Sequence, residues 1–218
     1  MSLPDTEAGS TLDSALDDRI AQDIHTGRLS PGAWLKQIDL EMRYGAERPA
    51  VRSALDALSK RRLVEHIPNR GYRVAEFTSR QIREIFYVRS VLEKVAAELI
   101  IENATDQAIE TAAKQLIKEA RKFETSMAEG LLSEQIAAAR RFHIEFLNLC
   151  PNQELVELIL DMRDRIPASL MRAWRSRERM SKSIEQHYKM VDALEARDVD
   201  LLKAVLTEHI MGNSPPLD

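Results

Sequence analysis

Three histidines in the second half of the sequence could together hold a metal ion. His143, His187 and His209 each lie on the apolar stripe of a separate predicted helix. Neutral imidazole is a common ligand of zinc, nickel and manganese, so three imidazoles that converge would form a metal site. A histidine on such a stripe is more often an ordinary packed core residue, and spacing alone does not show that the three meet.

One arginine also lies on an apolar stripe. Arg89 follows the spacing of Ile82 and Phe86 within a helix predicted over residues 79–103. Burying a cation is costly unless it is paired. Either Glu93, one turn later, neutralises it in a structural ion pair, or Arg89 faces a cavity and binds an anionic ligand, most naturally a carboxylate held bidentately.

Basic residues concentrate in the first third of the chain. The whole sequence of 218 residues has a net charge of −4, but residues 34–73 carry nine basic and five acidic residues, a net charge of +4 that leaves −8 elsewhere. Arg48 and Arg52 lie one turn apart at the start of a predicted helix, and Arg70 lies at the tip of a predicted hairpin. This pattern suits phosphate neutralisation and the reading of guanine edges, although charge alone fits a solvated surface equally well.

The elements that carry these arginines follow the order of a winged helix-turn-helix. A helix with an apolar residue every fourth position ends at Gly27. We expect a short extended piece, a short helix, a second helix and two strand-like runs to follow, at residues 34–35, 37–43, 48–61, 63–67 and 72–75.

The rest of the sequence, from about residue 78, is predicted to be helical, because Gly130 is the only glycine between Ser79 and Met211. Helical stripes are predicted at residues 79–103, 106–128, 133–149, 153–165, 168–180, 183–196 and 199–211. The fold class is therefore mainly α, with an N-terminal winged helix-turn-helix followed by an all-α bundle of six or seven helices.

These patterns divide the chain into four parts. We expect a disordered tail over residues 1–11, a DNA-binding domain over 12–77, a helical effector-binding and dimerisation domain over 78–212, and a frayed tail over 213–218.

Composition excludes some classes of protein. No stretch approaches 18 consecutive apolar residues, so we expect no transmembrane helix, and the polar start shows no secretory signal. A single cysteine, Cys150, cannot form an internal disulfide, which favours a reduced, cytoplasmic protein in which this residue is a packed thiol.

The first third resembles the GntR family of bacterial transcription regulators. The resemblance rests on Gly27-Arg-Leu-Ser-Pro-Gly32, on Tyr44-Gly-Ala-Glu-Arg-Pro-Ala-Val-Arg-Ser-Ala-Leu55 and on Pro68-Asn-Arg-Gly71. It implies that the protein binds DNA through five residues: Arg48, Arg52, Ser53, Arg70 and Gly71. Glu47 and Pro49 depart from the family pattern, which has small hydroxyl residues there, and a carboxylate close to phosphates would repel them.

The helical part resembles the FadR subfamily of that family. Phe142-His143, then Asn152, Glu185-Gln-His187 and Glu208-His209 carry the resemblance. It implies a small organic acid as effector, held by Arg89, and a divalent metal such as zinc, nickel or manganese, held by the three histidines. The family's aspartate, four residues before the first histidine, is replaced by Ala139.

The sequence therefore predicts a transcription regulator, more often a repressor in this family, and not an enzyme. We expect a cytoplasmic homodimer without membrane segments that binds a pseudo-palindromic operator on double-stranded DNA. A small carboxylic acid, with or without a metal, would control operator affinity. The alternatives are a metal-dependent enzyme built on the three histidines, and a helical interaction module whose basic end is only a solvated surface.

Overall fold

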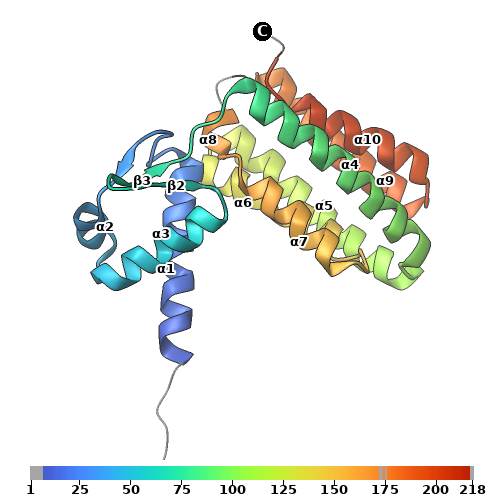
Figure 1. Cartoon of the computed structure of the whole chain (residues 1–218). Coiled ribbons are helices and arrows are strands. Elements are labelled where there is room, and N and C mark those ends of the chain that lie inside the picture. The colour runs from blue at the N-terminus through green and yellow to red at the C-terminus, as the bar shows by residue number, and fades with distance from the viewer. Residues whose placement is uncertain (1–6, 172–173, 175, 217–218) are drawn as a thin grey trace, which may run out of the picture. The chain divides into compact units, whose positions relative to one another are not determined.

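The computed structural model describes residues 7–171, 174 and 176–216 of the chain. Within these residues it contains ten helices and one three-stranded sheet (Figure 1). The predicted class, a winged helix-turn-helix followed by a helical domain, is confirmed.

The chain divides into two compact units. The first contains the residues up to Phe77 together with Asp164–Leu170, and the second contains Thr78–Arg163 and the residues from Met171 onward. The hydrophobic pattern gave no sign that Asp164–Leu170 would cluster with the first unit.

Three helices build the core of the first unit: α1 (Glu7–Thr26), α2 (Gln37–Tyr44) and α3 (Arg48–Lys60). Ile20 and Ile24 of α1 are fully buried against Val51 and Leu55 of α3. Burying four such side chains contributes several kcal/mol, at about 1.5–3 kcal/mol each.

A buried carboxylate ties α1 to α2. Asp23 is 6% exposed, and its Oδ2 accepts a hydrogen bond from the Tyr44 hydroxyl at 2.7 Å and also lies 2.7 Å from Arg43 Nη2. Gly45 then ends α2 in the left-handed region, at φ 62°, where a residue with a side chain would be strained. These contacts fix the turn between α2 and α3.

The wing is a small antiparallel sheet of order β1-β3-β2, formed by β1 (Trp34–Leu35), β2 (Val64–Ile67) and β3 (Gly71–Val74). The hairpin between β2 and β3 turns through positive φ at Asn69 (61°) and Gly71 (96°). Asn tolerates this region and Gly favours it, so the Pro-Asn-Arg-Gly sequence specifies a tight tip that exposes Arg70.

The second unit consists mainly of α4 to α10. Their bounds are α4 (Ser79–Asn103), α5 (Asp106–Glu129), α6 (Leu132–Leu147), α7 (Gln153–Asp164), α8 (Ala168–Met171), α9 (Arg177–Glu195) and α10 (Val199–Gly212); most of α8 falls in the first unit. Helix α4 starts at a complete capping box, in which Thr78 and Gln81 satisfy each other's backbone amides. Helices α4 and α10 lie side by side (Figure 1).

One pair of predicted helix bounds is wrong. The stripes at 168–180 and 183–196 become the one-turn helix α8 and a single helix, α9, that begins nine residues after Ala168. The Ser176 hydroxyl accepts a hydrogen bond from the Arg179 amide at 3.1 Å and starts α9 there. A strong N-cap therefore overrides the apparent break in hydrophobic spacing near Ser181.

The predicted tails fall partly outside the described residues. Helix α1 already begins at Glu7, within the range expected to be the N-terminal tail, and residues 1–6 lie outside the description. At the other end, α10 stops at Gly212, and residues 217–218 lie outside it. Among the residues described, no helix is both long enough and apolar enough to cross a membrane.

Candidate functional site

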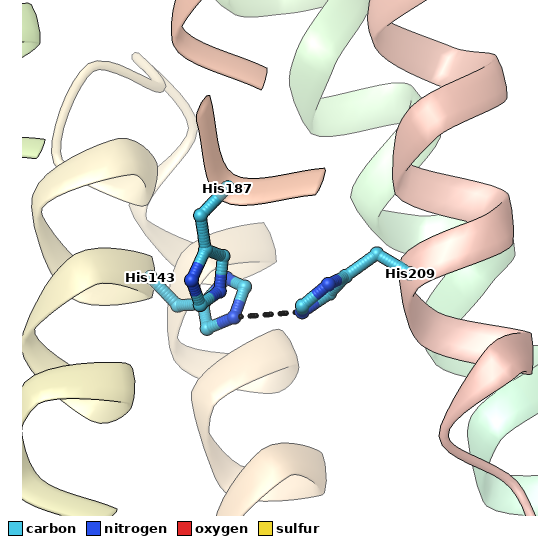
Figure 2. A group of neighbouring side chains, drawn as sticks. All are labelled: His143, His187 and His209. Atoms are coloured by element: carbon cyan, nitrogen blue, oxygen red, sulfur yellow. Dashed lines mark hydrogen bonds between the residues drawn. The ribbon is translucent and has the colours of Figure 1, made fainter. Parts of the chain in front are cut away.

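The three predicted histidines meet in the second unit. His143 comes from α6, His187 from α9 and His209 from α10, and their side chains point toward one another (Figure 2). One ring nitrogen from each can be chosen so that all lie within 4.8 Å of one another. The Nε2 atoms of His143 and His209 are 3.2 Å apart.

The cluster is buried and surrounded by aromatic rings. The three histidines are at most 5% exposed, and the Phe142 ring stacks on His187 with centroids 4.2 Å apart. Burial lowers the pKa of His143 well below its ordinary value, and the nearby Arg163, His209, His187 and Arg89 lower it further. His143 is therefore neutral at pH 7, the form that can coordinate a metal.

The donor set suits a divalent transition metal. Two nitrogens bound at about 2.05 Å to one tetrahedral zinc ion would be about 3.3 Å apart, close to the separation of His143 Nε2 and His209 Nε2. His143 Nδ1 is buried and has no hydrogen-bond partner in the described part of the chain, a polar atom that the packing alone does not satisfy.

No carboxylate joins the three imidazoles in any such group among the described residues. Ala139 occupies the position one turn before His143 on α6 and packs with its methyl group against an apolar cluster near Phe123. The site therefore offers three imidazole ligands, and a dication bound by them would keep its full charge and could accept a further ligand.

Arg89 is buried in an ion pair with Glu93, and no ligand is needed to keep its charge in the interior. Its Nη2 donates to Glu93 Oε1 at 3.1 Å, and Arg89 is 7% exposed while Glu93 is fully buried. Arg163 of α7 donates to the same carboxylate, to Oε1 at 2.8 Å and to Oε2 at 3.0 Å. Two guanidinium groups therefore share the carboxylate of Glu93.

Sequence reasoning missed Arg163. It lies near the end of α7, where a single charged residue in a helix of ordinary composition gives no signal of burial. Asn152, which the resemblance included, has a local structural role, because its Oδ1 accepts a hydrogen bond from the Leu155 amide at the start of α7, at 3.1 Å.

The residues predicted to contact DNA lie on the surface of the first unit. Helix α3 buries Val51 and Leu55 and exposes Arg48, Arg52 and Ser53 on the other side. Arg48 and Arg52 are four positions apart and share a helix face, and Ser53 lines a shallow surface pocket together with Arg52, so the three exposed side chains form one patch at the start of α3.

Each predicted DNA-binding arginine has a neighbour that holds it. Gln37 Oε1 accepts a hydrogen bond from Arg48 Nε at 3.1 Å, and the Arg70 guanidinium lies over the Trp34 ring, 4.9 Å from its centroid. Burial and a 2.6 Å hydrogen bond to Asp56 raise the pKa of Tyr72, and Arg52 lies close enough to that hydroxyl to oppose the rise. The sequence gave no indication of these three supports.

The N-terminus of α3 lacks a side-chain cap. Glu47 occupies the N-cap position with extended backbone, but its side chain makes no capping hydrogen bond, and Pro49 follows in the first turn. The negative charge of Glu47 interacts favourably with the helix dipole. Because its carboxylate accepts no capping hydrogen bond, the backbone amides of the first turn can donate to other acceptors, such as DNA phosphates.

Comparison with known proteins identifies the chain. The model of the bacterial regulatory proteins, gntR family, matches residues 12–74, and the model of the FCD domain matches residues 84–212, more than half of the chain. The protein belongs to the GntR family. It is a DNA-binding transcription regulator with an FCD domain, as its resemblance predicted.

Similar GntR-family proteins match over most of their length. The HTH-type transcriptional repressor GlaR of Escherichia coli is 26% identical over 90% of this chain and 91% of its own. The Nta operon transcriptional regulator of Aminobacter aminovorans is 26% identical, over 83% and 82%. The solved structure of E. coli McbR/YncC has the same fold, with a TM-score of 0.78 and 24% identity over 91% of this chain and 93% of that one.

The matched families and these relatives are regulators of transcription, so this GntR protein is not an enzyme. The three-histidine cluster therefore belongs to the FCD domain of a regulator.

The shared carboxylate gives a stability prediction. Glu93→Gln leaves Arg89 and Arg163 buried beside each other, and we expect it to lower the free energy of unfolding by about 3–5 kcal/mol in urea titrations. Sodium acetate should raise the Tm of this variant by more than it raises the Tm of the wild type, because the anion replaces the lost negative charge.

The control is Glu98→Gln, the same substitution at another position of α4. Glu98 of α4 pairs with Lys203 at a site where it is 43% exposed, so Glu98→Gln should cost less than about 1 kcal/mol. Equal losses for the two variants, or no selective effect of acetate, would contradict the role given to Glu93.

Proposed function

We propose that this GntR protein is a homodimeric repressor in the bacterial cytoplasm whose operator affinity is controlled by a small carboxylic acid bound in the FCD domain. Residues 12–77 would read a pseudo-palindromic operator, and residues 78–212 would bind the acid and form the dimer. The observation that carries the proposal is the buried cluster of three imidazoles, with two arginines that share one carboxylate and lie close enough to His143 to lower its pKa. The similarity to GlaR, which is named a repressor, supports repression over activation.

For DNA reading, we assign base contacts to the exposed patch at the start of α3, with Arg48, Arg52 and Ser53, and groove contacts to Arg70 and Gly71 of the wing. A recognition helix presents its N-terminal residues to the major groove. Arginine forms bidentate hydrogen bonds with guanine, and its fixed fork loses least freedom when a neighbour already orients it.

Arg52→Ala tests this assignment. Against an operator selected from a random duplex library, the variant should lose about 1–3 kcal/mol of binding free energy and relax base preference at one position per half-site. Binding is measured by gel shift at fixed salt, with circular dichroism to show an unchanged fold. Arg121→Ala, which removes the same charge from an exposed position on α5, is the control; equal affinity of both variants for the operator would refute the role of Arg52.

For the effector, the donors of the FCD site favour an anion. Arg89 and Arg163 both donate to the Glu93 carboxylate and could donate to a second one, and a metal ion held by His143, His187 and His209 would add two positive charges. A carboxylate is the natural ligand for both groups, because it accepts bidentate hydrogen bonds from arginine and can occupy an open metal position. The chain's own residues would bind and orient the acid, and the bound metal would supply Lewis-acid affinity for its oxygen.

Metal binding is tested by elemental analysis of protein purified without metal-affinity resin and then equilibrated with Zn²⁺ or Ni²⁺. We expect about one ion per chain in the wild type and loss of the ion in His187→Ala. Ala139→Asp, which restores a fourth ligand beside His143, should tighten binding by at least roughly tenfold. His66→Ala, at an exposed position of the wing, is the matched control.

The same samples test the effector in a thermal-shift screen of small carboxylic acids with and without metal. A ligand that binds the folded state raises Tm by mass action. The acid that raises Tm most should lose its effect in Arg89→Gln and should release the operator. Absence of metal and of any stabilising acid would refute ligand control by this site.

For dimerisation, we assign the interface to an exposed stripe on α4. Tyr87, Val91 and Val95 lie on one face of this helix, between 40% and 63% exposed, with Val91 at its midpoint. Arg80 and Glu102 lie eleven residues before and after Val91, about three turns, so they share this face. Antiparallel packing of two copies about Val91 would place Arg80 opposite the partner's Glu102, which is the self-complementarity that a two-fold interface requires.

Val91→Glu would place two carboxylates on the two-fold axis. We expect it to raise the Kd of the dimer by more than roughly 100-fold, because like charges across an interface cost several kcal/mol. Sedimentation equilibrium reports the change. Leu158→Glu, an equal change at an exposed residue of α7, should leave the dimer intact; a stable Val91→Glu dimer would exclude this interface.

A further inference from the structure

A cleft opens in the first unit between the start of α2, the first residue of α3 and the tip of the wing. Its volume is about 480 Å³, and its lining includes Trp34, Lys36, Gln37, Arg48 and Arg70. We propose that this cleft binds a backbone phosphate of duplex DNA and that Trp34, Lys36 and Gln37 are parts of that site. The inference rests on the proposed DNA-reading function and extends it to residues outside the recognition helix and wing tip.

Charge is the first argument. The nine residues that line the cleft include three cations, Lys36, Arg48 and Arg70, and no acidic residue. Three like charges around one concave space repel one another, and a phosphodiester placed between them relieves that repulsion. Each phosphate neutralised in this way also releases counterions from the DNA, which favours binding.

The second argument is the way two of the cations are held. Trp34 is 42% exposed on the edge strand β1, an unfavourable position for the largest apolar side chain unless it has a surface role. Its ring supports the Arg70 guanidinium, 4.9 Å from the centroid, while Gln37 accepts a hydrogen bond from Arg48 at 3.1 Å. One short segment of chain thus orients an arginine from α3 and an arginine from the wing toward the same space.

The position of the cleft favours DNA over a free anion. Arg48 belongs both to this lining and to the exposed patch at the start of α3, and Arg70 belongs both to the lining and to the wing tip. A duplex contacted by α3 and the wing must therefore pass over the cleft. Pre-oriented arginines on either side would bind its backbone with little loss of side-chain freedom.

Trp34 provides a direct readout. The chain has two tryptophans, Trp34 and Trp174, so Trp174→Phe leaves Trp34 as the only indole. We expect its fluorescence to change on titration with a random-sequence duplex of 25 base pairs, and sodium phosphate at matched ionic strength to leave it unchanged. An equal response to sodium phosphate would show a free-anion site and overturn the assignment to DNA.

Salt dependence measures the phosphate contact itself. Binding of the same duplex is followed by fluorescence anisotropy between 50 and 200 mM salt, and we expect Lys36→Ala to reduce the slope of log K against log salt by about 0.9. Lys114→Ala removes the same charge from an exposed position of α5 and should leave the slope unchanged.

Trp34→Ala should weaken binding about two- to fivefold, the range expected for one exposed cation–π contact, and Trp34→Phe should restore part of the loss. Circular dichroism melting shows whether each variant folds. A wild-type slope for Lys36→Ala, or equal affinity for Trp34→Ala and the wild type, would overturn the cleft while leaving DNA binding intact. Failure of the wild type to bind DNA in a salt-dependent way would overturn both the cleft and the proposed function.

Discussion

The buried carboxylate of Glu93 joins two helices of the FCD domain through arginines that lie near the histidine cluster. It is fully buried and pairs with Arg89 from its own helix and with Arg163 from α7. Burial lowers the pKa of His143 well below its ordinary value, and the positive charges of Arg163 and Arg89 lower it further, so this imidazole stays in the neutral form that a metal ligand requires. The same two guanidinium groups are the donors that the proposed carboxylic acid would use, so the proposed metal and acid sites share one arrangement of residues.

In the first unit, by contrast, cations must be presented to solvent in fixed positions. Exposed arginines ordinarily sample many rotamers, and ordering them on binding costs free energy. Here Gln37, Trp34 and Tyr72 each lie against one arginine, and buried Asp23 fixes the turn that carries α3. The cost of ordering is thus met during folding, and more of the contact energy remains for DNA.

Local patterns predicted much of this. The apolar spacing of α1 and α3, the Pro-Asn-Arg-Gly tip and the capping box at Thr78 depend on near neighbours in sequence, and each was readable from them. The three histidines were found one at a time by helical periodicity, but their convergence depends on how α6, α9 and α10 pack. Arg163 and Trp34 could not be assigned at all, because their roles come from partners at a long sequence distance, Glu93 and Arg70. The limits of α9 were misread because one serine cap outweighed the hydrophobic spacing.

Chain connectivity would give the proposed effector site and the recognition helix a physical route for coupling. Arg163, which binds Glu93, is followed directly by the segment Asp164–Leu170, which clusters with the first unit. In that segment Asp164 lies 3.6 Å from Arg61 at the C-cap of α3, and the Ser169 hydroxyl donates to the Ile24 carbonyl near the end of α1 at 3.0 Å. Because consecutive Cα atoms stay 3.8 Å apart, a backbone shift at Arg163 must be absorbed by this anchored segment or passed to α1 and α3. If the proposed carboxylic acid competes with Glu93 for Arg163, it would act one residue away from the segment that contacts α1 and α3. By linkage, DNA bound by α3 would then alter the affinity for the acid by the same factor.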